Sequence, residues 1–590
     1  MSAPTHEEQR RAWLDAFASA LERRDVDAAA SLFADECYWR DLVAFTWNLV
    51  TLEGRDAVAA MLTATLPAAS PRGWAAEGDA IESAEGVVEG RFNFETGAAR
   101  CKGHVRLRGG RCWTLTTTMD ELIGHEERRG RRRETGRCTA AGTKSVGEVG
   151  DPGWQPYCLV VGGGQGGITV GARLGVLGVP VLVVDRLERP GDAWRRRYAC
   201  LVTHDPVHAD HLPYMPFPDH WPVFSTKDRM GDWLEAYATV MGLNYWGSTE
   251  CRNAVYDEEG QRWTVTLNRE GKEVKVYPTH VVLATGLSGA PKVPEVPGAA
   301  TFVGLQQHSS EFSSGKGWEG KRCVVVGAGN SALDICGDLW AHGAQVTMVQ
   351  RSATLVVQSQ TLTGRMLGKW YSEEAVEAGV THEMADFAQS TVPYRLMPAR
   401  SKVLFDEIRA ANAEFYDGLS KAGFLLTFGP DGSGMPMRYL RRAAGSLIDT
   451  GNSELIASGK VRLKSGVEIS NAEADALVLN DGTRLPADLV VYATGYGNMS
   501  EVVAKLLGQG VADRIGRVWG MGSGLDGDPG PWEGELRNMW KPTRQPGLWI
   551  HAGMLALSRT YSRYLALQIK ARFEGIPTPV YGLAEVHHKR

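Results

Sequence analysis

The chain has 590 residues, which exceeds what one hydrophobic core supports and predicts two to four domains. Its composition is that of an ordinary globular protein, with 43% apolar and 23% charged residues. A net charge of −5 argues against nucleic acid or an anionic membrane surface as the main partner. Nine cysteines without CxxC spacing predict free thiols in a reducing compartment, a cytoplasmic location and no metal site.

The N-terminus shows neither an apolar run nor a signal-peptide pattern. The most apolar long stretch, residues 157–185, contains many glycines and is interrupted by Gln165 and Arg173. That stretch therefore predicts strand, helix and strand, and we expect no membrane span.

Residues 1–125 have a different pattern from the rest of the chain. Apolar residues recur at helical spacing over residues 9–33 and predict two amphipathic helices. Residues 86–122 alternate between polar and apolar, with turns between, as antiparallel strands do. The stretch "ADECYWRDLVAFTWNLVTLEGRDAV" resembles the SnoaL/ketosteroid-isomerase superfamily, which implies a small α+β cone fold.

Domains of that superfamily bind ligands, catalyse or dimerise. A catalytic pair such as Asp41 and His104 is conceivable by analogy with the isomerases, but spacing alone does not support it. We expect dimerisation or substrate delivery instead. Residues 126–153 are basic, glycine-rich and without periodicity, which predicts a solvated linker, with a docking or nucleic-acid role as the alternative.

A first glycine-rich loop follows an apolar strand in "CLVVGGGQGGITVGARLGVLGVPVLVVDR". Gly162 permits a tight turn, Gly164 lets the backbone approach a pyrophosphate, and Gly167 lets helix and strand pack closely. The second strand ends at Asp185, which is placed to accept hydrogen bonds from ribose hydroxyls. Strand, glycines, helix and terminal acid together predict a dinucleotide site with its pyrophosphate on the helix N-terminus.

A second loop of the same design occurs in "KRCVVVGAGNSALDICGDLWAHGAQVTMVQRS". Gly327 and Gly329 occupy the first two glycine positions, and Ala332 is still small enough for the third. Its second strand is followed by Arg351 and Ser352 rather than by an acid, which favours the 2′-phosphate of NADPH over NADH. The alternative is that Arg351 is an ordinary surface charge at a strand end.

Two dinucleotide sites on one chain, one of them for NADPH, suggest a flavoprotein whose first site holds FAD. Apolar strands end in Ala-Thr-Gly within residues 281–289 and 489–498, as at passages between the FAD and NADPH domains of such proteins. Asp488 precedes the second of these strands, and we expect it near the ribityl chain of the flavin.

The expected fold class is therefore α/β, with two Rossmann-like dinucleotide-binding domains preceded by the small α+β domain. We expect the FAD domain at residues 154–290 and 488–590, and the NADPH domain at residues 291–487. The NADPH domain contains a helical insertion over residues 358–439, which caps the active site or makes an oligomer contact.

The stretch "FVGLQQHSSEF" matches the FxGxxxHxxx(F/Y) fingerprint of class B flavin-dependent monooxygenases, and it lies between the two glycine loops as in that family. "GDAWRRRY" is similar to the family's GGxW segment, and "HLPYMPFPDHWPVFSTKDRMGDWLEAYA" resembles its YUCCA branch. The resemblance covers residues 155–575. Phe312 followed by serine favours the heteroatom-oxygenating and YUCCA branches over typical Baeyer–Villiger enzymes.

The resemblance implies that NADPH reduces FAD, that reduced flavin and O2 form a C4a-(hydro)peroxide, and that one oxygen atom enters a small organic substrate. An amine, a sulfide or an aromatic 2-oxo acid that is decarboxylated is the expected substrate. Baeyer–Villiger oxygenation of a ketone is the runner-up. A flavin-bearing binding or regulatory protein is the alternative of another class, a dithiol reductase is disfavoured for want of CxxC, and a homodimer remains open.

The resemblance also assigns residues. His308 is expected to hold the hinge between the two nucleotide domains rather than to act as a base, and His204 replaces a family asparagine near the flavin. A helix from about Ser558 is expected to point its N-terminus at the flavin ring, with Arg559 and Tyr561 lining the pocket. The expected cofactor-binding residues are Gly162, Gly164, Gly167, Asp185, Arg186, Trp194 and Asp488 for FAD, and Gly327, Gly329, Asn330, Ser331, Arg351 and Ser352 for NADPH.

Overall fold

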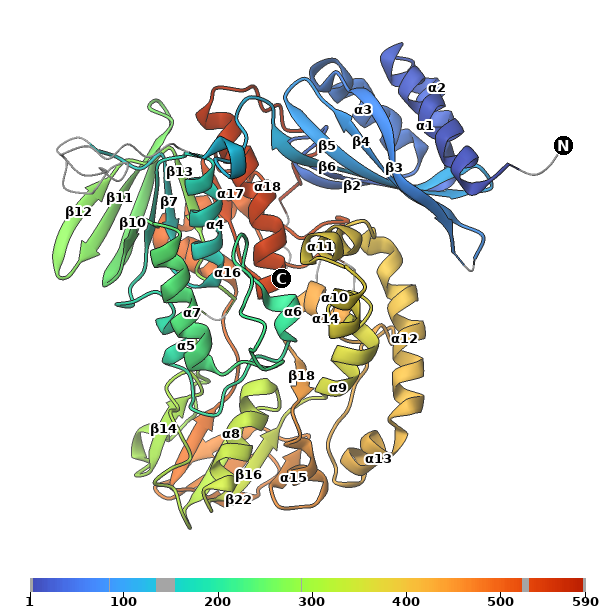
Figure 1. The fold of residues 1–590 in the computed structure, drawn as a ribbon. Coiled ribbons are helices and arrows are strands. Elements are labelled where there is room, and N and C mark those ends of the chain that lie inside the picture. The colour runs from blue at the N-terminus through green and yellow to red at the C-terminus, as the bar shows by residue number, and fades with distance from the viewer. Residues whose placement is uncertain (1–3, 84, 134–153, 288, 523–529, 587–590) are drawn as a thin grey trace.

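The computed structural model describes residues 4–83, 85–133, 154–287, 289–522 and 530–586. Most of the predicted basic linker, residues 134–153, lies outside the described residues. Figure 1 shows an N-terminal domain resting on one end of a larger α/β body, whose second nucleotide domain lies at the opposite end.

The N-terminal domain is a six-stranded sheet, in the order β2-β1-β6-β5-β4-β3, curved around three helices. Only β1 and β6 pair in parallel within it. Aromatic side chains fill the interior of the cone, including a stacked Trp13–Phe17 pair whose ring centroids are 4.8 Å apart. Its elements are α1 His6–Glu22, α2 Val26–Ser31, β1 Phe33–Leu42, β2 Leu49–Glu53, α3 Arg55–Ala69, β3 Arg72–Glu82, β4 Val88–Glu95, β5 Ala99–Arg108 and β6 Arg111–Leu122.

Asp41 has a structural place in this domain. Its buried carboxylate accepts hydrogen bonds from the hydroxyls of Thr46 and Thr117 and from the backbone N–H groups of Phe45 and Thr46. Because this carboxylate is satisfied by its own domain, it closes a turn and needs no ligand to compensate its burial.

The first nucleotide domain is built on a parallel five-stranded sheet, in the order β24-β13-β7-β8-β9. An antiparallel meander, β10-β11-β12, is attached to it. The elements are η1 Gly130–Arg132, β7 Cys158–Val161, α4 Gln165–Val176, β8 Val181–Val184, α5 Asp192–Arg195, α6 Val207–Asp210, α7 Lys227–Val240, β9 Tyr245–Trp246, β10 Thr249–Asp257, β11 Arg262–Arg269, β12 Lys272–Val276, β13 His280–Leu283 and β24 Leu548–Ile550.

The second nucleotide domain repeats the design with a parallel sheet in the order β14-β23-β15-β16-β19. In both sheets the strand before the glycine loop lies in the middle, so that the loop emerges at the carboxyl edge between neighbouring strands. The elements are η2 Ala299–Thr301, β14 Leu305–His308, β15 Arg322–Val326, α8 Asn330–Ala341, β16 Gln345–Gln350, α15 Ser453–Ala457, β19 Arg462–Ser465, β20 Ile469–Ala472, β21 Ala476–Leu479, β22 Arg484–Pro486 and β23 Leu489–Tyr492.

The insertion expected at residues 358–439 is helical and lies beside the second nucleotide domain, below the N-terminal domain in Figure 1. The parallel pair β17 and β18 joins it to that domain. The remaining elements are β17 Leu355–Gln358, α9 Ser359–Thr361, η3 Leu362–Leu367, α10 Glu373–Glu377, α11 His382–Ser390, η4 Tyr394–Leu396, α12 Met397–Ala411, α13 Ala413–Lys421, α14 Gly434–Arg442, β18 Ser446–Asp449, α16 Met499–Leu507, α17 Gln509–Ile515 and α18 Leu555–Phe573.

The outer face of the N-terminal sheet packs against the rest of the same chain. Arg106 donates to the carbonyl and hydroxyl oxygens of Thr391, directly after α11. Thr118 donates to the Tyr564 hydroxyl on α18 at 3.0 Å. This domain therefore braces both the insertion and the long C-terminal helix.

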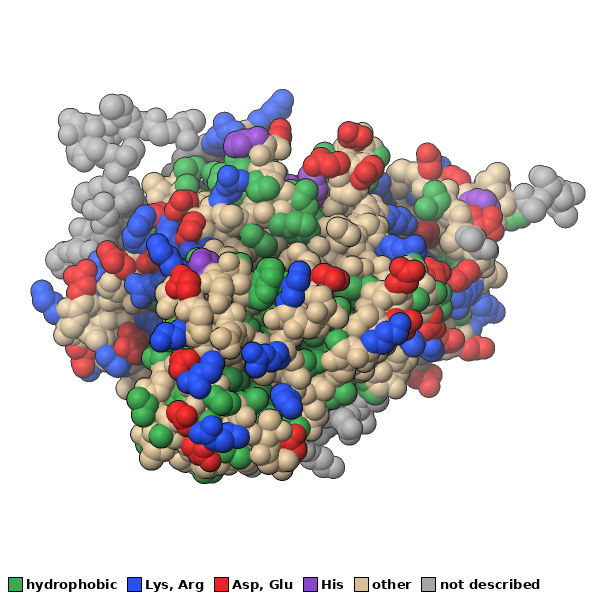
Figure 2. Space-filling view, turned by 90° about the horizontal axis from the view of Figure 1, so that it is seen from below, with side chains coloured by type: hydrophobic (Ala, Val, Ile, Leu, Met, Phe, Trp, Pro, Cys, Tyr) green, Lys and Arg blue, Asp and Glu red, His purple; other side chains and the backbone are tan. Residues whose placement is uncertain are grey.

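The expected fold class is confirmed, with two Rossmann-like sheets behind a SnoaL-like α+β domain. Among the described residues, no helix combines the length and the apolarity that crossing a membrane requires. Figure 2 shows one face of the molecule, on which acidic and basic side chains are interspersed.

Candidate functional site

One cavity of about 1750 Å³ connects both glycine loops with the insertion. Its wall includes the turns after β7 and β15, the N-terminus of α18 and side chains from η3, α12 and α14. A pocket for one small ligand spans roughly 300–1,000 Å³, so this cavity is large enough for more than one.

The first glycine loop has the geometry that its spacing predicts. Gly162 has a φ of +107°, and an added Cβ there would lie 2.4 Å from the carbonyl oxygen of Ala284. An added Cβ at Gly167 would lie 1.8 Å from the carbonyl oxygen of Gly162, so helix and strand are in close contact. Gly164, by contrast, faces open space with nothing within 4 Å of an added Cβ. The residues present therefore fit a pyrophosphate over the N-terminus of α4.

Asp185 closes the second strand of this unit. Its carboxylate accepts hydrogen bonds from the N–H groups of Gly163, at 2.6 Å, and Leu187, at 2.8 Å. Burial raises the pKa of this carboxyl, and those two N–H groups oppose the shift. Arg186 and Trp194 also line the cavity, and the Trp194 indole donates to Gln165 Oε1 at 3.2 Å.

The second glycine loop has the same form. Gly327 has a φ of +129°, Gly329 faces open space, and Ala332 is fully buried in the third position. Asn330 and Ser331 begin α8 and line the cavity, and Asn330 Oδ1 accepts from the Ile448 N–H at 2.8 Å. The amide thereby ties the helix N-terminus to β18.

Arg351 and Ser352 lie on the cavity wall directly after β16. The Arg351 side chain is 77% exposed, and its nearest carboxylate, Glu468, is 4.0 Å away. A guanidinium with so little engagement by the protein is free to pair with a phosphate.

His204 and His308 belong to different nucleotide domains. His204 lines the cavity, with Nδ1 3.3 Å from the Asn330 amide and Nε2 3.4 Å from Asp334 on α8. His308 is buried at the end of β14, where its ring contacts the Ser310 hydroxyl at 2.8 Å and the Gly495 carbonyl at 3.1 Å. His204 thus joins the two nucleotide domains, whereas His308 joins β14 to the turn after β23 within the second domain. Burial lowers the pKa of His308.

The expectation for Asp488 is wrong. It precedes β23 at the end of the sheet opposite the glycine loop, where its carboxylate binds the Arg322 guanidinium at 2.7 Å. That pairing lowers the Asp488 pKa to about 2. Cofactors bind at the carboxyl ends of parallel strands, so a residue at the amino end cannot reach the flavin.

The expectations for Arg559 and Tyr561 are wrong as well, since neither lines the cavity. Helix α18 begins at Leu555, which turns Arg559 away to an ion pair with Asp386 of α11, in which the arginine is buried and the carboxylate is 11% exposed. Tyr561 stacks on Trp540 with ring centroids 4.0 Å apart and accepts from Arg40 of the N-terminal domain. Both residues fix α18 to neighbouring elements and do not take part in the cavity wall.

Several cavity residues were missed by the sequence reasoning. His551 follows β24 with both ring nitrogens buried and without a hydrogen-bond partner among the described residues, and burial lowers its pKa to about 3. Tyr439 accepts a hydrogen bond from the Met554 N–H at the start of α18. Asp205, Asp210 and Gln389 line the wall near the insertion. They lie in loops or on short helices without periodicity, which leaves no signal in a single sequence.

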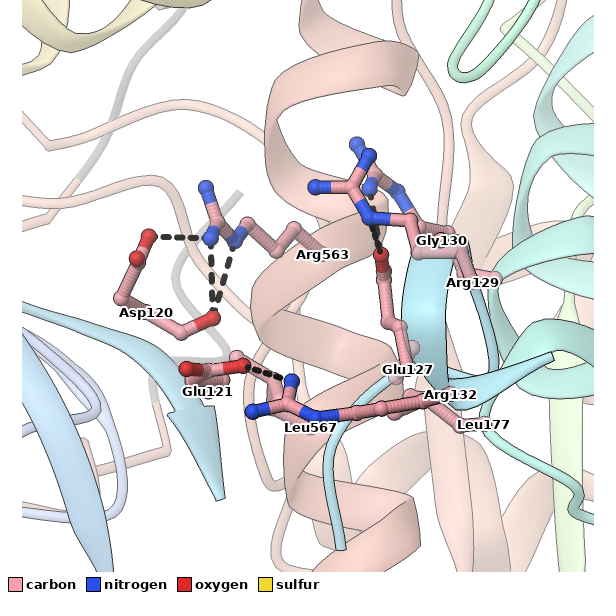
Figure 3. Close-up of a pocket in the computed structure, with 11 residues that line it drawn as sticks. Asp120, Glu121, Glu127, Arg129, Gly130, Arg132, Leu177, Arg563 and Leu567 are labelled. Atoms are coloured by element: carbon pink, nitrogen blue, oxygen red, sulfur yellow. Dashed lines mark hydrogen bonds and ion pairs between the residues drawn. The ribbon is translucent and has the colours of Figure 1, made fainter. Parts of the chain in front are cut away.

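A second hollow, of about 360 Å³, lies between the N-terminal domain and α18 (Figure 3). Arg563 binds Asp120 across it, Arg132 binds Glu121 at 3.1 Å, and Glu127 binds a further arginine. Because acidic and basic groups pair across this hollow, it joins domains and is not assigned a ligand.

Two family models match the chain. Residues 12–118 match a SnoaL-like domain, and residues 156–390 match "Pyridine nucleotide-disulphide oxidoreductase". The sequence contains no CxxC pair, so the second match describes the nucleotide-binding architecture and not a dithiol reaction.

Relatives of known function narrow the class of enzyme to which the chain can belong. The chain is 29% identical over 344 residues to "Indole-3-pyruvate monooxygenase YUCCA1" of Oryza sativa subsp. japonica, covering 58% of this chain and 77% of the relative. It is 30% identical over 345 residues to "Probable indole-3-pyruvate monooxygenase YUCCA9" of Arabidopsis thaliana, covering 58% and 75%. A solved cyclohexanone monooxygenase shares the fold, with a TM-score of 0.51 and 19% identity over 71% of this chain and 88% of that structure.

The fold and these matches define a flavoprotein that binds a pyridine nucleotide. The chain belongs to the class B flavin-dependent monooxygenases and carries a SnoaL-like domain at its N-terminus. It is an FAD-dependent enzyme that uses NADPH, as the two glycine loops predict.

Proposed function

We propose that this enzyme uses NADPH and O2 to insert one oxygen atom into a small organic molecule held between α18 and the insertion. The observation that carries the proposal is the continuity of the main cavity, which reaches from both glycine loops to the insertion. A nicotinamide, a flavin and a substrate placed in one enclosed space are what such a reaction requires.

The first loop and Asp185, Arg186 and Trp194 hold FAD in this proposal. The second loop, with Asn330, Ser331, Arg351 and Ser352, holds NADPH. Together these cofactors supply hydride transfer and O2 chemistry. The protein binds and orients them, and the helices of the insertion exclude water from the reacting atoms.

His204 and His308 have a positioning role in this proposal and are not assigned a catalytic step. His204 joins the two nucleotide domains through its contacts with α8, and His308 joins β14 to the turn after β23. We assign His308 to the hinge and His204 to the contact between the flavin side and α8. A change in the position of the nucleotide would alter this contact.

The substrate wall favours an apolar molecule. It combines aliphatic and thioether side chains, which adapt to varied shapes. The named relatives make an aromatic 2-oxo acid one candidate, oxidised with loss of CO2, and N- or S-oxygenation is the other. The wall residues from the insertion include Leu362, Met366, Leu367, Met397, Leu404 and Met435.

The test is to supply purified FAD-loaded enzyme with NADPH and O2 and to follow both consumption and product. Oxygenated product formed in proportion to NADPH would support the proposal. Tight FAD and NADPH binding without NADPH oxidation would instead support a binding or regulatory protein.

Replacing Arg351 by alanine should weaken the binding of NADPH far more than the binding of NADH. Loss of a charge-assisted contact to a 2′-phosphate costs about 1.5–3 kcal/mol, which corresponds to roughly a ten- to hundredfold rise in the KM for NADPH. Steady-state kinetics with both nucleotides measure the effect, and Arg409→Ala is the control, because Arg409 is an exposed residue of α12 that does not line the cavity. Equal losses for NADH and NADPH would remove Arg351 from the nucleotide site.

A further inference from the structure

Two carboxyl groups face the substrate end of the main cavity without a partner. Asp205 and Asp210 both line it, on the loop after His204 and at the end of α6. Asp210 is only 3% exposed. Within the described part of the chain, neither carboxyl receives a hydrogen bond or forms an ion pair.

Asp210 ends α6, which contacts α18 and lies beside the insertion in Figure 1, and Asp205 stands two residues before this helix. Asp205 is close enough to Tyr439 of α14 to interact with its hydroxyl, which accepts from the N–H of Met554, the residue that caps the start of α18. Asp210 interacts with Asp205 and with Arg559. His208 and His211 flank it on its own segment, and His208 pairs with Glu373 at 3.1 Å.

Arg559 does not neutralise Asp210 by direct contact. Its Nε and one terminal nitrogen bind Asp386, and its other terminal nitrogen donates to the carbonyls of Ala209 and His211 at 2.7 Å each. All three guanidinium nitrogens are thus engaged. Arg559 is therefore also unavailable to a substrate carboxylate.

A buried carboxylate without hydrogen bonds is costly, and two that interact cannot both stay ionised cheaply. Burial together with Asp205 raises the pKa of Asp210 well above its usual range. Without a cationic neighbour Asp210 therefore tends to hold a proton. A ligand that brings a positive charge removes this cost and an anionic ligand increases it.

We propose that Asp205 and Asp210 form a subsite for a basic nitrogen, so that the substrate is an apolar amine rather than a 2-oxo acid. The inference rests on the proposed oxygenation reaction and names the substrate class for that same site. A carboxylate beside the ammonium group can take its proton, which leaves the nitrogen lone pair free to react and the carboxyl neutral.

Binding of matched amines and acids to the oxidised holoenzyme tests the subsite. The probes are tryptamine against indole-3-propionate, phenethylamine against 3-phenylpropionate, and octylamine against nonanoate, measured by calorimetry and by the flavin absorbance. At least one amine should bind about tenfold or more tightly than its matched acid. If every acid binds as tightly as its amine, or no amine binds, the inference fails.

Asp210→Asn and Asp205→Asn assign the effect to these residues. Each should weaken amine binding by about ten- to a hundredfold and leave the matched acid unchanged or tighter. Asp219→Asn, on the exposed part of the following loop, is the control and should change neither. Equal losses for amine and acid would overturn the subsite. Because these measurements need no turnover, a wild-type enzyme that fails to oxidise NADPH would refute the reaction without affecting this comparison.

Stability gives an independent measure of the buried charge. A carboxyl whose pKa is raised by folding stabilises the protein least at high pH, because the folded state must then hold the unpaired charge. The midpoint of unfolding of Asp210→Asn should therefore rise relative to the wild type between about pH 5 and about pH 8. A midpoint difference that does not change with pH would show that Asp210 is not the unpaired carboxyl described here.

Discussion

Gly167→Ala is expected to yield a protein that is purified with little or no FAD. The added Cβ would lie 1.8 Å from the carbonyl oxygen of Gly162, which is backbone and cannot rotate away. Helix α4 must then move off β7, and its N-terminus leaves the position that holds the pyrophosphate. Overpacking of this kind costs about 1–3 kcal/mol, or roughly a five- to 150-fold loss in FAD affinity.

Gly175→Ala, in the same helix, is the matched control. An added Cβ there meets nothing within 4 Å, and alanine is the better helix former. This variant should therefore retain its flavin and unfold at an equal or higher denaturant concentration. The ratio of flavin to protein after purification, and titration of the apoprotein with FAD, measure both variants. Full retention of FAD by Gly167→Ala would contradict the assignment of this loop.

The nucleotide domains could be predicted from the sequence because their determinants are local. Each glycine loop combines a strand, a turn and a helix within about thirty residues, and the positions that spacing assigns to the turn are those with positive φ. The same holds for Arg351, whose place follows from the end of its strand.

The substrate side could not be predicted in this way because distant segments build it. Asp488 directly precedes an expected strand and Arg559 lies on an expected helix, yet one side chain pairs with Arg322 and the other with Asp386. Which face of an element meets a cofactor is decided by packing, and spacing alone does not show it. Asp205 and Asp210 become notable only when their surroundings are known.

The interface between the N-terminal domain and the rest of the chain is the clearest feature that is built from distant segments. Arg40 of β1 reaches Glu535 through two hydrogen bonds, at 2.6 and 2.9 Å, and donates to the carbonyl of Ser390 on α11. Its guanidinium also lies 4.5 Å from the ring centroid of Tyr394. Since Gln389 lines the cavity, the N-terminal domain is linked through α11 to the substrate wall.

Arg40→Met is expected to destabilise the enzyme by about 3–5 kcal/mol, because it leaves Glu535 buried without its bidentate partner. Arg40 and Glu535 side chains are 1% and 4% exposed, so solvent screens little of this effect. The double variant Arg40→Met/Glu535→Met should lose less than the sum of the two single variants, since neither charge of this pair is left without the other. Urea unfolding, followed by intrinsic tryptophan fluorescence and separately by release of flavin, measures each variant. If the N-terminal domain braces the catalytic body as the contacts indicate, both signals should shift together for Arg40→Met. A loss confined to the tryptophan signal, with flavin release unchanged, would show that the domain folds on the body without supporting it.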